Sequence, residues 1–126
     1  MSASPVIRIA SPAKVNLGLE ILGKRDDGYY EIRSVLAMVD LCDDIVFTRL
    51  TGHGRSRISG MPGVPDEGNL ILKAIRAFNT ATGLKIAWQV DVTKRIPAPS
   101  GLGGASSNAA CTLLALNDAA GNPLDR

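Results

Sequence analysis

A chain of 126 residues, of which 45% are hydrophobic and 21% are charged, has the composition of one ordinary globular domain. A formal net charge of +2 and an aromatic content of 4% argue against a nucleic-acid-binding surface, which is basic or rich in stacking rings. No apolar run approaches the roughly 18 residues of a membrane span. We therefore expect neither membrane nor nucleic-acid partners. Because the two cysteines stand far apart in apolar surroundings, we expect reduced thiols and a cytoplasmic protein.

The first half of the chain predicts short strands separated by turns. Segments of β-branched or alternating residues indicate strands at 6–10, 15–22, 32–41, 45–50 and 55–58. The dipeptide Asp27-Gly28 is typical of a hairpin turn, and Asp43-Asp44 is expected to separate the third strand from the fourth. Residues 60–68 hold two prolines and three glycines, so they predict a loop.

The second half of the chain predicts two helices separated by a strand. Apolar residues recur at helical spacing over 69–82, with Asn69 as the N-cap and Gly83 as the C-terminal stop. Alternation over 86–93 indicates a strand with one buried face, and a second helix is expected from residue 105 or 106 to 119. This order of elements predicts an α+β fold, with helices packed on one face of a mostly antiparallel sheet.

A glycine-rich loop lies between that strand and the second helix, with the sequence Pro97-Ala98-Pro99-Ser100-Gly101-Leu102-Gly103-Gly104-Ala105-Ser106-Ser107. Glycines let successive backbone N–H groups converge, and the start of a helix adds unpaired donors and the positive end of the helix dipole. The loop is therefore expected to bind a phosphate group, and a hydroxyl of Ser106 or Ser107 is suited to Mg²⁺. The alternative is a loop whose serines merely cap the helix.

The loop differs from three well-known glycine loops. A Walker A loop needs a lysine before its hydroxyl residue, and no lysine stands between Gly101 and Ser107. The G-x-G-x-x-G spacing of dinucleotide-binding loops is also absent. The glycine loop of protein kinases joins two strands, whereas this one opens a helix.

Two smaller groups of polar residues precede the loop. Lys14 and Asn16 lie two apart in an alternating segment, so both are expected on one face of a strand while Leu17 points to the other. Tyr29 and Tyr30 follow the hairpin turn, where their rings are available to stack on a base. The alternatives are a solvated strand face for the first group and a cover over the edge of the core for the second.

Taken in order, these groups resemble one family. The segments SPAKVNL (11–17), GKRDDGYYEI (23–32) and KRIPAPSGLGGASSNAA (94–110) are similar to the 4-diphosphocytidyl-2-C-methyl-D-erythritol kinases of the GHMP kinase superfamily, and 65–74 is similar to the first helix of that family. The resemblance covers almost the whole chain and implies the GHMP kinase N-terminal domain, with a fold like domain 2 of ribosomal protein S5. It also implies that ATP phosphorylates the 2-hydroxyl group of 4-diphosphocytidyl-2-C-methyl-D-erythritol, in the non-mevalonate route to isoprenoids.

The resemblance also implies roles for individual residues. The loop over 97–107 would bind the phosphates of ATP, with Ser106 or Ser107 beside Mg²⁺. Lys14 would be the catalytic lysine, beside the attacking hydroxyl group. The substrate would be bound by Asn16, Asp27, Gly28, Tyr29 and Tyr30.

Several positions depart from the family pattern. Tyr29 would stack on the cytosine ring, but Tyr30 replaces the histidine that follows in the family, and a phenol cannot reproduce the two imidazole nitrogens. Pro99, Ser100 and Ala105 stand where glycines are common. A GHMP kinase for a different small alcohol, such as homoserine or mevalonate, is therefore an alternative.

The catalytic aspartate of the family follows the loop helix, and no position of this sequence matches it. The C-terminal domain of the family, which closes the cleft, has no counterpart either, since family members are more than twice as long. We therefore expect residues 1–126 to be an incomplete ATP-binding domain with little or no kinase activity of its own. The alternative from another functional class is a non-catalytic nucleotide-binding module.

Overall fold

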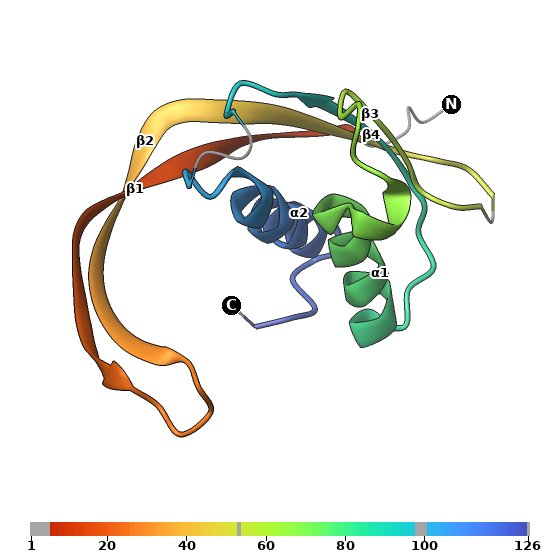
Figure 1. The fold of residues 1–126 in the computed structure, drawn as a ribbon. Helices are drawn as coiled ribbons and strands as arrows, with labels where there is room; N and C mark the ends of the chain where they lie inside the picture. Colours follow the sequence, from red (N-terminus) through yellow and green to blue (C-terminus); the bar gives the residue numbers. More distant parts are fainter. Residues whose placement is uncertain (1–5, 53, 98–100, 126) are drawn as a thin grey trace.

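The computed structural model describes residues 6–52, 54–97 and 101–125, which form one mixed sheet with two α-helices on one face (Figure 1). In chain order the elements are β1 (Val6–Lys24), β2 (Tyr30–Arg49), β3 (Arg57–Ser59), the 3₁₀-helix η1 (Asp66–Gly68), α1 (Leu70–Thr82), β4 (Trp88–Thr93) and α2 (Gly104–Ala119). The strand order is β1-β2-β4-β3, and only the β3–β4 pair is parallel. The predicted α+β fold with a mostly antiparallel sheet is confirmed. Neither described α-helix is long and apolar enough to cross a membrane.

β1 and β2 are each one long strand, where the sequence predicted two shorter strands for each. The antiparallel ladder extends along both strands, with register shifts between Pro12 and Lys14, between Asn16 and Gly18 and between Ile21 and Gly23. β1 is an edge strand, so Pro12, which has no N–H group, is accommodated at the first of these bulges. Asp43-Asp44 does not end β2, where the sequence predicted a break. The Asp43 side chain is buried and accepts hydrogen bonds from residues 94–96.

The β1–β2 pair continues past the sheet as a ribbon that curves toward the helix face (Figure 1). We call residues 14–24 and 30–41 the outer ribbon. Leu17 is 69% exposed, because the helices cover the sheet and leave the outer ribbon open. The other exposed apolar side chains of the outer ribbon are Leu19, Ile21, Leu22, Ile32, Val35, Leu36, Met38 and Leu41.

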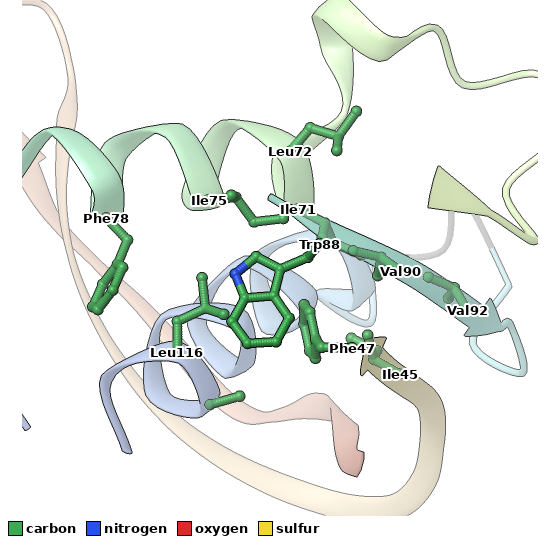
Figure 2. Close-up of a cluster of buried hydrophobic side chains, with 11 residues drawn as sticks. Ile45, Phe47, Ile71, Leu72, Ile75, Phe78, Trp88, Val90, Val92 and Leu116 are labelled. Atoms are coloured by element: carbon green, nitrogen blue, oxygen red, sulfur yellow. The ribbon is translucent and has the colours of Figure 1, made fainter. Parts of the chain in front are cut away.

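The core lies between the sheet and the two helices (Figure 2). Phe47 of β2 and Trp88 of β4 meet edge to face, with ring centroids 6.2 Å apart. The helices contribute Ile71, Leu72, Ile75 and Phe78 of α1 and Ala115 and Leu116 of α2. Both β4 and α2 pack into this cluster, which holds them next to each other. The glycine-rich loop connects these two elements.

α1 begins and ends where the sequence signals predict. Asn69 Oδ1 accepts hydrogen bonds from the backbone N–H groups of Ile71 at 2.9 Å and Leu72 at 3.3 Å, which caps the start of the helix. Gly83 ends the helix with a left-handed φ of 75°, and its N–H donates to the carbonyl of Asn79 at 2.9 Å. β3 and β4 likewise lie within two residues of their predicted bounds.

α2 begins at Gly104, one residue before the predicted range, and its N-cap Gly103 has a left-handed φ of 71°. No side chain makes a capping hydrogen bond at this end. Ser106 and Ser107 lie within the first turn, so the alternative that they cap the helix is wrong. The buried face of α2 is half polar and consists of Asn108, Cys111, Thr112, Ala115, Leu116 and Asn117.

We predict that Gly60→Ala destabilises the protein more than Gly63→Ala. Both glycines have a left-handed φ, 90° and 81°, so each substitution strains the backbone by about 1–2 kcal/mol. A Cβ atom at Gly60 would also lie 1.9 Å from the carbonyl oxygen of Val92, whereas a Cβ atom at Gly63 would meet open space. Urea denaturation should therefore show a free energy of unfolding that is lower by about 1–3 kcal/mol in Gly60→Ala than in Gly63→Ala. Equal losses would contradict the close approach of Gly60 to β4.

Candidate functional site

Lys14 is in direct contact with the glycine-rich loop. Its backbone N–H donates to the carbonyl of Leu102 at 2.8 Å, and its Nζ donates to the carbonyl of Gly101 at 2.9 Å. The structure therefore brings together two groups that stand 87 residues apart in the sequence. Ala98, Pro99 and Ser100 of the predicted loop lie outside the described residues.

Two glycines of the loop lie close to the side chains of Lys14 and Ile96. A Cβ atom at Gly103 would lie 3.0 Å from both Cγ and Cε of Lys14. A Cβ atom at Gly104 would lie 3.1 Å from Cγ2 of Ile96. Both distances are shorter than an ordinary van der Waals contact, and Gly103 also has a left-handed φ. Glycine is therefore favoured where the start of α2 closely approaches the side chains of Lys14 and Ile96.

The carboxylate of Asp43 holds the residues that lead into the loop. The side chain is completely buried, and Oδ1 accepts hydrogen bonds from the backbone N–H groups of Arg95 at 2.7 Å and Ile96 at 2.9 Å. Oδ2 accepts a hydrogen bond from Nζ of Lys94 at 2.6 Å. Sequence reasoning predicts only a strand end at Asp43 and misses this role. The available signal is a pair of adjacent carboxylates that stands between the apolar residues 41–42 and 45–47 of one strand.

Burial by itself raises the pKa of the Asp43 carboxyl group, because burial penalises the charged form. Hydrogen bonds from the Ile96 N–H, the Lys94 ammonium and the Arg95 N–H outweigh burial and hold this pKa below its ordinary value of 3.8. Asp43 is therefore an ionised partner of Lys94, whose side chain is 25% exposed. The next residue, Asp44, pairs with the guanidinium of Arg95 at the surface.

A buried polar network connects Asp43 to the first turn of α2. Ser11 Oγ donates to Ser107 Oγ at 3.0 Å. In the amide orientation that satisfies its neighbours, the side-chain nitrogen of Asn108 lies 2.7 Å from Ser11 Oγ. The same nitrogen lies 3.1 Å from both Gly104 O and Asp43 Oδ2. The network joins β1, β2 and α2 beneath the loop, and the sequence analysis assigns no role to the side chains of Ser11, Asp43 or Asn108.

A cavity of about 470 Å³ lies beside the loop. One wall is mostly apolar and includes Met61, Pro62, Val64, Leu70 and Ile71. The glycine-rich loop also lines the cavity, with Gly101, Gly103, Gly104, Ala105 and Ser106. Ser106 therefore faces the cavity, while Ser107 is bonded to Ser11. A larger hollow of about 920 Å³ lies across α1 and includes none of the predicted site residues.

The predicted substrate residues lie on the outer ribbon and its turn. Asp27 pairs with Arg25 at 3.0 Å and accepts a hydrogen bond from the Tyr29 N–H at 3.0 Å. Tyr29 and Tyr30 are 75% and 59% exposed, so the alternative that they cover the core is wrong. Asn16 is exposed and accepts a hydrogen bond from a serine hydroxyl across the ribbon. These residues lie along the ribbon, whereas Lys14 meets the loop where the ribbon joins the sheet.

The described residues contain no group of three or more His, Cys, Asp or Glu side chains that could hold a metal ion together. Mg²⁺ usually keeps several waters and binds through substrate phosphates with one or two protein oxygens. The Ser106 hydroxyl at the cavity fits that kind of role. Cys42 and Cys111 are both free, and Cys111 is buried.

Residues 69–126 match the family model described as the GHMP kinases N terminal domain. The chain is 42% identical over 116 residues to the 4-diphosphocytidyl-2-C-methyl-D-erythritol kinase of Cupriavidus taiwanensis, a match that covers 92% of this chain and 40% of that protein. The protein of the same name from Protochlamydia amoebophila is 45% identical over 116 residues, which cover 91% of this chain and 40% of that protein. The chain therefore spans about two fifths of the length of these relatives.

Solved structures are also similar to this chain. The crystal structure of a 4-(cytidine 5'-diphospho)-2C-methyl-D-erythritol kinase aligns with a TM-score of 0.77 at 35% identity and covers 94% of this chain and 42% of that one. A homoserine kinase from Cytophaga hutchinsonii aligns with a TM-score of 0.70 at 19% identity, over 99% of this chain and 38% of that one. At that identity the second likeness shows the fold alone.

We predict that Asp43→Asn removes stability that is present at neutral pH and lost in acid. Because folding lowers the pKa of Asp43, its ionised form stabilises the native state above pH 3.8, and this contribution disappears as the pH falls through the lower folded-state value. The free energies of unfolding of wild type and variant should differ by about 2 kcal/mol at neutral pH. Denaturant titrations at decreasing pH should show this difference shrinking below about pH 4. A difference that stays constant would contradict an ionised Asp43.

Proposed function

This chain belongs to the GHMP kinase family, and from that membership we propose that residues 1–126 form the N-terminal, ATP-binding domain of a kinase. The proposed reaction is phosphorylation of the 2-hydroxyl group of 4-diphosphocytidyl-2-C-methyl-D-erythritol, a step of non-mevalonate isoprenoid biosynthesis. The observation that carries the proposal is the contact between Lys14 and the glycine-rich loop, with Nζ 2.9 Å from Gly101 O. It places a cation beside the start of α2, where a phosphate is favoured.

The loop and the cavity supply complementary parts of an ATP site. The first backbone N–H groups of a helix such as α2 have no partners within the helix, so they are available to bind an anion. The positive end of the helix dipole favours the same anion. The neighbouring cavity has an apolar wall and a volume of about 470 Å³, which suits a nucleotide base. We assign the loop over 97–107 to the phosphates and the cavity to the base.

Ser106 is the serine that we assign to Mg²⁺. It lines the cavity, whereas the hydroxyl of Ser107 accepts a hydrogen bond from Ser11 inside the polar network. When bound, Mg²⁺ would neutralise charge on the phosphates of ATP. Ser106 would contribute one oxygen to it, and the rest of its ligands would be phosphate and water oxygens.

The proposed reaction needs alignment, charge neutralisation and removal of one proton. The attacking hydroxyl oxygen forms a bond to the γ-phosphorus while the bond to the β–γ bridging oxygen breaks, which releases ADP. We assign to Lys14 the stabilisation of the negative charge that develops between these groups. The catalytic aspartate of the family follows the loop helix in sequence, so we expect the proton acceptor from that part of the whole protein and little or no turnover by residues 1–126 alone.

The outer ribbon is the proposed binding region for the acceptor. The ring of Tyr29 is 75% exposed, which leaves a face open for stacking on cytosine. Tyr30 and the turn residues Asp27 and Gly28 lie next to Tyr29, whereas Asn16 lies nearer the sheet, where it pairs with Leu36. Free cysteines and a net charge of +2 support a cytoplasmic enzyme that acts on this small molecule without nucleic acid or membrane partners.

The test of this function is a coupled ATP-turnover assay with the whole protein that contains this chain. We expect turnover with 4-diphosphocytidyl-2-C-methyl-D-erythritol to exceed turnover with homoserine or mevalonate by a large factor. Equal or faster turnover with either of the other alcohols would assign the protein to a different GHMP kinase activity. ATP binding without turnover of any of the three would support the non-catalytic module.

We predict that Lys14→Ala lowers kcat by roughly 10²–10³-fold in the same assay, because a preorganised positive charge is lost from the transition state. ATP affinity, measured by calorimetry, should change only a few-fold, because the backbone N–H of residue 14 still donates to Leu102 O in the alanine variant. A large loss of ATP affinity with an unchanged kcat would show that Lys14 binds the phosphate donor and is not catalytic.

We predict that Tyr29→Ala raises the KM for the cytidylyl substrate by about tenfold, since stacking on an aromatic ring contributes about 1–3 kcal/mol per base. The KM for ATP should not change, because the turn lies at the far end of the outer ribbon from the loop (Figure 1). Val35→Ala is the matched control, because Val35 is an exposed side chain of the same ribbon. Equal effects of the two substitutions would argue against a stacking role for Tyr29.

A further inference from the structure

We propose, on the basis of the ATP-binding function above, that Asp43 is a positioning residue for the nucleotide. Its buried carboxylate holds both ends of the glycine-rich loop in the arrangement that binds phosphate, and it does so without touching the ligand. Neither the resemblance nor the fold assigns a role to this residue.

The entry to the loop depends on Asp43 through its main chain. The N–H groups of Arg95 and Ile96 both donate to Oδ1, at 2.7 and 2.9 Å, immediately before Pro97. Two adjacent N–H groups on one oxygen atom fix the direction in which the chain leaves β4. A carboxylate that is completely buried has little freedom to move, so it acts as a rigid reference point for the loop.

The exit from the loop depends on the same carboxylate through Asn108. The Asn108 side-chain nitrogen lies 3.1 Å from Asp43 Oδ2 and 3.1 Å from Gly104 O, the first residue of α2. The start of α2 and the end of β4 are therefore tied to one carboxyl group. Because the loop connects these two elements, Asp43 sets the positions of both of its ends.

Lys94 adds a charge to this arrangement. Its Nζ lies 2.6 Å from Asp43 Oδ2, and its side chain lines the cavity beside the loop. The ion pair keeps the ammonium at the cavity wall, close to the start of α2. Without the carboxylate, Lys94 would be free to move into the cavity or out to solvent, and the wall of the nucleotide site would change.

Asp44 provides a matched control. It is the adjacent carboxylate of β2 and it also contacts the loop entry, but through the Arg95 guanidinium and with a side chain that is 50% exposed. Asp43→Asn keeps an oxygen for the two N–H groups but turns an NH₂ group toward Lys94 and Asn108. Asp44→Asn removes the same charge from the same strand without entering the buried network.

The experiment compares ATP binding by Asp43→Asn, Asp43→Ala and Asp44→Asn in the whole protein, by calorimetry in MgCl₂ buffer. The temperature is one at which circular dichroism shows every variant folded. We expect Asp43→Asn to weaken ATP binding by about tenfold and Asp43→Ala by more, because small displacements of positioning groups have large effects. Asp44→Asn should stay within about twofold of wild type. Wild-type affinity in Asp43→Asn would overturn the proposal.

Two further measurements separate positioning from stability alone. Ile75→Ala removes core packing away from the loop and should lower the melting temperature without changing ATP affinity. Amide hydrogen exchange should show loss of protection at Arg95 and Ile96 in Asp43→Ala but not in Asp44→Asn. Unchanged protection in Asp43→Ala would overturn the positioning role. Wild-type protein that binds no ATP would instead contradict the proposed function, and the exchange measurement would still decide whether Asp43 holds the loop.

Discussion

The carboxylate of Asp43 accepts hydrogen bonds from two backbone N–H groups and one ammonium group inside the protein, and the place of the glycine-rich loop depends on these bonds. An ionised carboxylate without partners would be strongly unfavourable in that position. The native arrangement is therefore the one in which the end of β4 reaches the middle of β2. This requirement explains why β2 passes through Asp43 and Asp44 without a break.

In this domain apolar packing holds the layers together, whereas hydrogen bonds determine the direction of the glycine-rich loop. The cluster around Phe47, Trp88 and Leu116 buries the common face of the sheet and helices, and hydrophobic burial of this kind is nondirectional. It holds the layers together without fixing the direction of a connecting loop. Direction comes from hydrogen bonds, at the entry from Asp43 and at the exit from the Lys14 backbone. Hydrogen bonds therefore hold the described ends of the loop in place although the loop is rich in glycine.

Features that depend on local chemistry could be predicted from the sequence, as the Asn69 cap and the Gly83 stop of α1 show. The contact between Lys14 and the loop could be anticipated only through the resemblance, because it joins residues far apart in the chain. The role of Asp43 could not be predicted, since no local pattern shows which N–H groups a carboxylate will meet. The same holds for α2, where apolar Leu114 is 41% exposed while Asn108 and Thr112 are buried, because Asn108 belongs to the polar network beneath the loop.

The outer ribbon carries its turn well away from the network around Asp43. The turn is held by its own short-range bonds, such as the pair between Arg25 and Asp27, and its side chains are exposed. Mutations at this tip leave the loop, its glycines and the buried carboxylate as they are. Substitutions can therefore accumulate at the ribbon tip independently of the glycine-rich loop, so the two parts of this scaffold are free to diverge at different rates.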